Sequence, residues 1–216
     1  MMPPHKEGDS MTEKELMLSG NLYIAQGEEL ARDYARARRL LRQIHSLTEE
    51  QAQERLKLFR QLFGSIGQKF WVEPPFHTDY GCNTYIGENF YANYDYIILD
   101  VARVFIGDHV FFGPRVSIYT AGHPIDAQVR NTQLEYGKEV KIGNDVWIGG
   151  NTVINPGVTI GSNVVIGSGS VVTKDIPDGV VAAGVPCRVI RAITDADRQY
   201  WQEQERRYRE LMDKDL

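Results

Sequence analysis

The sequence predicts a mainly β protein, a parallel β-helix with helices on either side of it, and two observations support this fold class. The first is an unbroken run of six-residue repeats from residue 142: IGNDVW, IGGNTV, INPGVT, IGSNVV, IGSGSV and VTKDIP. The second is helical spacing of apolar residues before residue 65 and after residue 193. A fixed short period is the signature of a solenoid, whose repeats stack on their neighbours.

The N-terminal segment predicts helices. We expect residues 1–10 to form a disordered tail and residues 11–66 to form a helical subdomain. Five residues recur there at the spacing of one helix face: Leu30, Tyr34, Ala37, Leu41 and Ile44. Thr48 and Gln51 form a capping-box pattern before a second helical run, and Gly64 is a stop signal. The arginines near residue 38 are interpreted as a solvated face.

Residues 67–192 are expected to form the β-helix. Each repeat opens on an aliphatic residue, and a small or β-branched residue follows four positions later. Three repeats, about 18 residues, would make one coil, so that the aliphatic residues stack inside it at the inter-strand spacing of about 4.8 Å. The pattern recurs before residue 118, with a two-residue slip near Val104.

Residues 120–139 interrupt the repeats and contain too few aliphatic residues to line a β-helix, so we expect a loop. Long excursions from a regular scaffold often carry function. His123 lies at the base of this loop, and histidine is the side chain whose charge changes near neutral pH, which makes it a candidate general base. A turn histidine that bonds nearby backbone is the alternative. Residues 193–216 predict a C-terminal helix, capped near Thr194, whose aromatic residues serve packing or subunit contacts.

Composition excludes several classes of function. A net charge of −5 argues against a nucleic-acid partner, because such proteins carry clustered positive charge. Cys82 and Cys187 are too few for a disulfide framework, and the first ten residues lack the apolar stretch of a signal peptide, so we expect a cytoplasmic protein. No apolar run approaches the roughly 20 residues that cross a bilayer, so no membrane partner is expected.

From Met11 to Arg191 the chain resembles the maltose and galactoside acetyltransferases, in the stretches FYANYDYIILD, YTAGHPID, VWIGGNTVINPGVTIG and VVTKDIPDGVVAAGVPCRVIR. Ala25 and Glu135 stand where galactoside enzymes carry aspartate and methionine, so the maltose enzymes are the nearer branch. The resemblance implies a left-handed hexapeptide-repeat β-helix, a homotrimer with active sites between subunits, acetyl-CoA as co-substrate, a saccharide acceptor, and no metal.

The resemblance also implies roles for individual residues. It makes His123 the catalytic base, and Glu135 is expected to orient it and to stabilise its charged form. The expected sugar-binding residues are Asp79, Tyr91, Asn93 and Asp100. The expected coenzyme-binding residues are Trp147, Gly150, Ser168, Thr173, Lys174, Arg188 and Arg191. From the residues alone, these carboxylates, amides, glycines and basic groups are equally typical of solenoid corners and solvated surface.

The predicted function is acetyl transfer from acetyl-CoA to a hydroxyl, expected to be the 6-hydroxyl, of maltose, glucose or a related saccharide by general-base catalysis. A sugar-binding or scaffold trimer without chemistry is one alternative, since fold alone does not establish activity. An acetyltransferase with a non-sugar acceptor is another. A zinc lyase on the same fold would need three converging histidines, which the spacing of His77, His109 and His123 does not fit.

Overall fold

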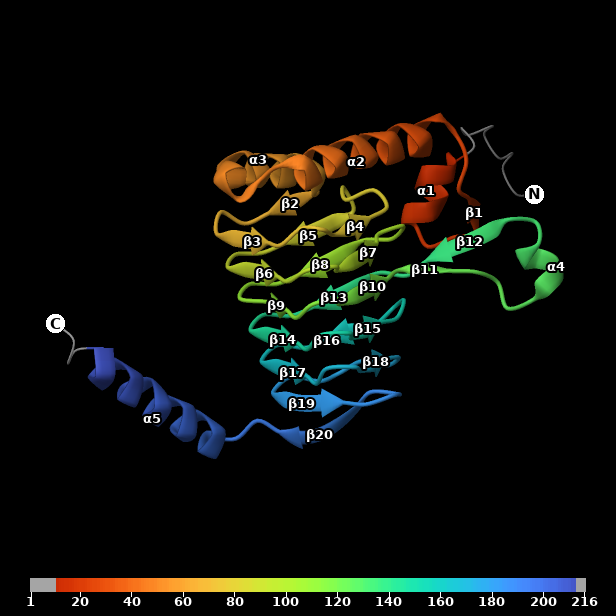
Figure 1. Cartoon of the computed structure of the whole chain (residues 1–216). Coiled ribbons are helices and arrows are strands. Elements are labelled where there is room, and N and C mark those ends of the chain that lie inside the picture. The colour runs from red at the N-terminus through yellow and green to blue at the C-terminus, as the bar shows by residue number, and fades with distance from the viewer. Residues whose placement is uncertain (1–10, 213–216) are drawn as a thin grey trace, which may run out of the picture.

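The computed structural model describes residues 11–212, so the expected disordered tail, residues 1–10, lies outside the described residues. The body is a parallel β-helix in which strands form three long faces (Figure 1). It confirms the left-handed β-helix with flanking helices that the sequence predicted. Helices cover the N-terminal end of this body, and one helix extends from its other end.

Each coil contributes one strand to each face. The first face holds β2 (Ser65–Ile66), β5 (Thr84–Ile86), β8 (Val104–Ile106), β13 (Val140–Ile142) and β16 (Thr159–Ile160). The second holds β3 (Phe70–Val72), β6 (Phe90–Ala92), β9 (Phe111–Phe112), β14 (Val146–Ile148), β17 (Val164–Ile166) and β19 (Val180–Ala183), with β20 (Arg188–Ala192) antiparallel at its edge. The third holds β4 (His77–Thr78), β7 (Ile97–Leu99), β10 (Ser117–Tyr119), β15 (Val153–Ile154) and β18 (Val171–Val172).

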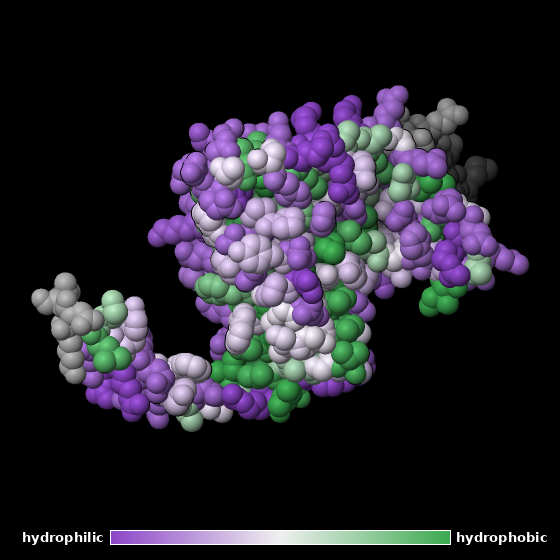
Figure 2. Space-filling view, in the orientation of Figure 1, coloured by the Kyte–Doolittle hydropathy of each residue, from purple (hydrophilic) through white to green (hydrophobic). Residues whose placement is uncertain are grey.

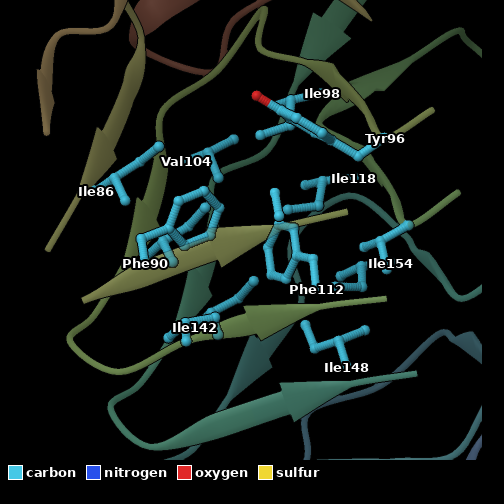
Figure 3. Close-up of a cluster of buried hydrophobic side chains, with 14 of the residues drawn as sticks. Ile86, Phe90, Tyr96, Ile98, Val104, Phe112, Ile118, Ile142, Ile148 and Ile154 are labelled. Atoms are coloured by element: carbon cyan, nitrogen blue, oxygen red, sulfur yellow. The ribbon is translucent and has the colours of Figure 1, made fainter. Parts of the chain in front are cut away.

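The residue that opens each repeat points into the β-helix, as predicted. These six are at most 3% exposed: Ile142, Ile148, Ile154, Ile160, Ile166 and Val172. Figure 3 shows three of them beneath aromatic and aliphatic side chains of the earlier coils. In the repeats from residue 142, two of the residues four positions after the opening one carry buried hydroxyls. Both are satisfied locally, because Thr152 donates to the Gly149 carbonyl and Ser170 to the Gly167 carbonyl.

The coils before residue 120 are longer than the predicted 18 residues. Ile97 pairs with Ser117, twenty positions later, whereas Val153 pairs with Val171, eighteen positions later. The two extra residues lie at the corner that leads from the third face to the first, which we call the third corner. Phe105 follows Ile97 by eight positions, but its counterpart Thr159 follows Val153 by only six. The two-residue slip near Val104 in the sequence pattern therefore arises at the third corner.

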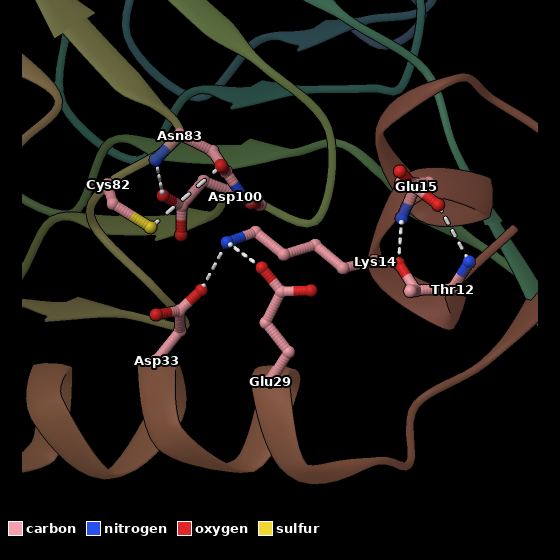
Figure 4. Close-up of polar contacts among 8 residues, drawn as sticks. All are labelled: Thr12, Lys14, Glu15, Glu29, Asp33, Cys82, Asn83 and Asp100. Carbon is pink, nitrogen blue, oxygen red and sulfur yellow. Dashed lines mark hydrogen bonds and ion pairs between the residues drawn. The ribbon is translucent and has the colours of Figure 1, made fainter.

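The N-terminal helices cap the β-helix. They are α1 (Glu13–Leu18), α2 (Glu28–Ser46), a 3-10 turn (Glu49–Gln51) and α3 (Ala52–Leu62). α2 buries Ala37, Leu41 and Ile44 in the core, whereas Tyr34, expected beside them, is 47% exposed. The predicted capping box at Thr48 is present. Lys14 of α1 forms ion pairs with two acidic residues of α2, Glu29 and Asp33 (Figure 4).

Residues 120–139 leave the β-helix at the third corner. They form β11 (Ala121–Gly122), α4 (Ala127–Arg130) and β12 (Leu134–Gly137), and β12 pairs with both β11 and β1 (Tyr23–Ile24). The C-terminal helix α5 (Asp195–Met212) buries none of its residues in this chain, and the surface near β20 is rich in hydrophobic residues (Figure 2). Within residues 11–212, no helix has the length and apolar character needed to cross a membrane.

The Tyr96 hydroxyl offers a test of this interior. The side chain is 1% exposed, its ring stacks on Phe76 with centroids 4.8 Å apart, and its oxygen has no hydrogen-bond partner among residues 11–212. A buried unsatisfied polar group costs about 1–3 kcal/mol. We therefore expect Tyr96→Phe to raise the free energy of unfolding by about 1 kcal/mol. Urea denaturation measures this change, and a clear loss of stability would contradict it.

Candidate active site

Asp100, expected to bind sugar, instead lies inside the third corner with its side chain fully buried. Its Oδ1 accepts hydrogen bonds from the Thr78 hydroxyl at 2.8 Å and the Tyr80 N–H at 2.9 Å. Its Oδ2 accepts from the Asn83 N–H and the Thr84 hydroxyl, both at 3.2 Å. An ionised carboxylate has about four lone-pair sites, and these donors use them. Asp100 therefore braces residues 78–84, and its carboxylate is buried within this chain.

A cavity of about 360 Å³ opens beside the third corner, against α2, β1 and β12. We call it the acid cavity, because both Asp79 and Glu135 line it. Asp79 follows β4 within the turn that Asp100 braces, and Glu135 lies on β12 opposite Tyr23 of β1. Ala25, at the position where galactoside enzymes carry an aspartate, lines the same cavity.

Negative charge dominates the acid cavity. Burial and the nearby carboxylate of Asp100 raise the pKa of Asp79 to about 6, although Arg38 opposes the rise from 3.5 Å away. Burial, with help from neighbouring carboxylates, also raises the pKa values of Tyr23 and Tyr80, so both hydroxyls stay neutral. A neutral ligand with several hydroxyls suits such a cavity, because it can donate hydrogen bonds to the carboxylates.

His123 is exposed and lies one residue beyond the paired part of β11. Gly122 pairs with Tyr136 in the antiparallel β11–β12 ladder. Continuing that register sets His123 beside Glu135 on one side of the sheet, since directly opposite residues project to the same face. Among residues 11–212, no hydrogen bond or ion pair joins the two side chains. The continued register thus sets the expected base and its acid at opposite positions, without a hydrogen bond or ion pair between them.

Tyr91 and Asn93 lie in a different place from Asp79. With Phe111 and Trp147 they line a hollow on the second face, which we call the aromatic hollow. Trp147 is 56% exposed there. The Asn93 Oδ1 accepts a hydrogen bond from the Tyr94 N–H at 2.8 Å, and the φ of Asn93 is not positive, so the residue is not in a left-handed conformation.

Four expected coenzyme-binding residues lie on the coils after the excursion. Gly150 and Ser168 follow β14 and β17 at the corner between the second and third faces, which we call the second corner. Thr173 and Lys174 directly follow β18 and are exposed. A Cβ on Gly150 would approach the Pro114 carbonyl oxygen to 2.9 Å. Close stacking of the coils therefore explains this glycine without a ligand.

Arg188 and Arg191 lie on β20, at the edge of the last coil. Arg191 forms two bonds to Asp197, at 2.7 and 2.9 Å, and this pairing holds the pKa of the Asp197 carboxyl well below its usual range. Asp197 also accepts from the N–H and hydroxyl of Thr194. The charge of Arg191 is thus already partnered at the start of α5.

The structure does not unite the expected sugar-binding residues within one chain. Asp79 and Glu135 lie at the third corner, whereas Tyr91 and Asn93 lie on the second face and at the second corner. The strands of the third face separate these two corners (Figure 1). The single chain therefore holds these residues in two separate regions. In the described part of the chain, no three His, Cys, Asp or Glu side chains gather as a metal site would require.

The sequence analysis missed Tyr34, which it placed among packing residues, and Arg38, which it placed on a solvated face and which contacts the cavity residues Tyr34 and Asp79. Tyr34 lines the cavity, and the Arg38 guanidinium lies 4.5 Å from the centroid of the Tyr34 ring. A signal was available, since Leu30, Tyr34 and Arg38 follow one another at four-residue intervals along one side of α2.

Two sequence families match the chain. The maltose acetyltransferase hexapeptide capping motif matches residues 16–67, and the bacterial transferase hexapeptide family, with six repeats, matches residues 139–174. The first match covers the capping helices, and the second covers the coils that follow the excursion. With the β-helix, they define a hexapeptide-repeat transferase.

Similar proteins identify the type of transferase more closely. A maltose O-acetyltransferase structure from Clostridium difficile 630 is 54% identical, with a TM-score of 0.85 over 86% of this chain and 100% of that one. A galactoside acetyltransferase in complex with coenzyme A is 44% identical, with a TM-score of 0.85 over 88% and 94%. The galactoside O-acetyltransferase of Escherichia coli strain K12 is 44% identical over 191 residues, 88% of this chain and 93% of that protein.

The chain belongs to the maltose and galactoside acetyltransferase family and is an O-acetyltransferase of that type. The family that its sequence motifs predicted is thereby confirmed.

Removal of the Asp100 carboxylate should loosen the third corner. We expect Asp100→Ala to lower the free energy of unfolding by at least about 3 kcal/mol, since each buried group left unsatisfied costs about 1–3 kcal/mol. Asp100→Asn keeps the shape and one acceptor oxygen, so its loss should be smaller. Urea denaturation of both variants measures this order, and wild-type stability of Asp100→Ala would refute the bracing role.

Asp79 should link stability to pH. Its folded pKa of about 6 lies above its ordinary 3.8, so the folded wild type binds more protons than the unfolded chain in this window and loses stability as pH rises through it. Asp79→Asn does not titrate. Its free energy of unfolding, measured relative to that of the wild type, should therefore rise by up to about 2 kcal/mol between pH 4 and pH 7. Calorimetry at several pH values measures the gain, and a difference that does not change with pH would contradict it.

Proposed function

We propose that the protein transfers the acetyl group of acetyl-CoA to the 6-hydroxyl of maltose, glucose or a related saccharide. The observation that carries this proposal is the acid cavity, whose lining residue Glu135 lies opposite His123 when the β11–β12 register is continued, in a chain of this family. Its carboxylates accept hydrogen bonds from sugar hydroxyls and disfavour an anionic acceptor. A primary hydroxyl is the least hindered on a hexose, so it reaches the base most easily.

The transfer is direct. The neutral imidazole of His123 accepts the proton of the sugar hydroxyl while that oxygen attacks the thioester carbonyl. The C–S bond then breaks, and the coenzyme thiolate takes the proton back from the imidazolium. The charge of Glu135, opposite His123 in the continued β11–β12 register, stabilises the imidazolium. Cys82 is not needed as a nucleophile, since burial raises the pKa of its thiol and keeps it protonated.

The coenzyme uses the later coils. Its pantetheine arm runs past Gly150 and Ser168 at the second corner, with Trp147 as an apolar wall, and Thr173 contacts the same arm. Lys174, Arg188 and Arg191 bind the phosphates through charge-assisted bonds. A similar galactoside acetyltransferase was solved with coenzyme A, which supports coenzyme A as the acetyl carrier. Both cysteines are free, in keeping with a reducing cytoplasm.

The active site is completed by a second copy of the chain. We infer a homotrimer in which the acid cavity of one copy faces the aromatic hollow of the next, so that Tyr91 and Asn93 reach the sugar held by Asp79. The exposed aromatic side chains of Phe111 and Trp147, 49% and 56% exposed, support such a contact. Asp100 acts in this site as a positioning residue, because it holds the turn that carries Asp79.

Coenzyme release from acetyl-CoA tests the proposal against glucose, maltose, galactosides and chitin fragments. A positioned general base contributes about 10²–10⁴-fold, so His123→Ala should lose about that much in kcat while acetyl-CoA binding persists. Arg42→Ala, on the exposed side of α2, is the matched control.

Full activity of His123→Ala would remove that residue as the base. No rate with any sugar would favour a non-sugar acceptor or a sugar-binding trimer without chemistry.

A further inference from the structure

The acid cavity continues along α2 beyond its carboxylates. Gly27, Leu30 and Tyr34 line this extension, which follows α2 for about two turns, or about 10 Å. That length exceeds one sugar ring. The cavity therefore has room for a ligand whose first ring lies at Asp79 and Glu135 and whose second ring lies against α2.

Tyr34 differs from the other aromatic residues of the cavity. Tyr23 and Tyr80 are 1% and 7% exposed, and their rings belong to the packed wall, whereas Tyr34 is 47% exposed. An aromatic ring at a cavity rim offers a flat apolar surface beside a polar hydroxyl. The C–H face of a pyranose ring fits such a surface, while its hydroxyls at the edge reach polar groups nearby.

Arg38 fixes the Tyr34 ring in place. Its guanidinium lies 4.5 Å from the ring centroid and its Nη2 lies 3.5 Å from the Asp79 Oδ1, so one side chain connects the rim to the acidic wall. Its buried Nε has no hydrogen-bond partner among residues 11–212. Arg38 follows Tyr34 by one helical turn. Leu30, which lines the cavity, precedes Tyr34 by one turn. The guanidinium therefore supports the ring from the C-terminal side of α2, and the cavity extends on the N-terminal side.

We propose that Tyr34, supported by Arg38, forms a second acceptor subsite that binds the second ring of a disaccharide or longer saccharide. The proposal rests on acetyl transfer to a saccharide, and it names the acceptor class as one with at least two linked rings. The first ring is held by Asp79 and Glu135, and the second stacks on Tyr34. Arg38 is a positioning residue for that stacking.

The test compares maltose with glucose in the coenzyme-release assay. Loss of an aromatic stacking partner changes affinity by up to about tenfold, so Tyr34→Ala should lower the maltose-to-glucose ratio of kcat/KM by about that factor, through KM. Tyr34→Phe keeps the ring and should keep the ratio. Arg38→Lys preserves a positive charge near Asp79 but lacks the planar guanidinium, and it should lower the ratio in part. Arg42→Ala is again the control.

Equal losses for both sugars in Tyr34→Ala, or no change in the ratio, would overturn the subsite while leaving acetyl transfer intact. If the wild type acetylates no sugar, the proposed function fails separately, and calorimetric titration with maltose and glucose then tests the subsite. Tighter binding of maltose that Tyr34→Ala abolishes would support it, and equal or absent binding of the two sugars would overturn it.

Discussion

Each coil of this β-helix must return its inward side chain to a place directly over the one before, because strands on all three faces pair in parallel register. A strand shifted by one residue would turn its buried side chains outward. Additional residues are therefore tolerated only at corners, and this chain concentrates them at the third corner. The two extra residues of the early coils, the excursion and Asp79 all lie there. The position of the candidate site follows from this constraint on register.

A widened corner needs internal support, and Asp100 provides it. Its carboxylate accepts bonds from two backbone amides and two hydroxyls across residues 78–84. The equivalent place in the next coil is held by Thr120, whose hydroxyl accepts from the Ala102 N–H and donates to the Leu99 carbonyl. Burial and this nearby carboxyl group together raise the pKa of Asp79. Stability of the scaffold and electrostatics of the cavity thus share one buried group.

The sequence predicts the features that depend on local spacing. The period of six identifies the inward residues such as Ile148, and helical spacing identifies the buried side of α2. It does not distinguish an aspartate that braces a corner from one that meets a ligand, because burial of Asp100 depends on how residues 78–84 fold over it. Likewise, the separation of Tyr91 from Asp79 depends on Tyr91 lying on the second face and Asp79 at the third corner. Tyr34 was grouped with packing residues because helical spacing predicts which side of α2 it occupies. That spacing does not predict whether another element covers its ring.

The excursion also separates the β-helix into two halves, and this separation bears on how the chain folds. Parallel strands on either side of it pair with partners 16 to 20 residues away, whereas β10 and β15 pair across 36 residues. Loop-closure entropy grows with the logarithm of length, so this doubling adds only about 0.6 kcal/mol. The excursion, however, also pairs with β1, far back in the chain. Two halves of the β-helix, each built from local contacts, are therefore connected by contacts between residues far apart in the sequence. The sequence separation of contacting residues, more than stability, sets the rate at which a chain folds.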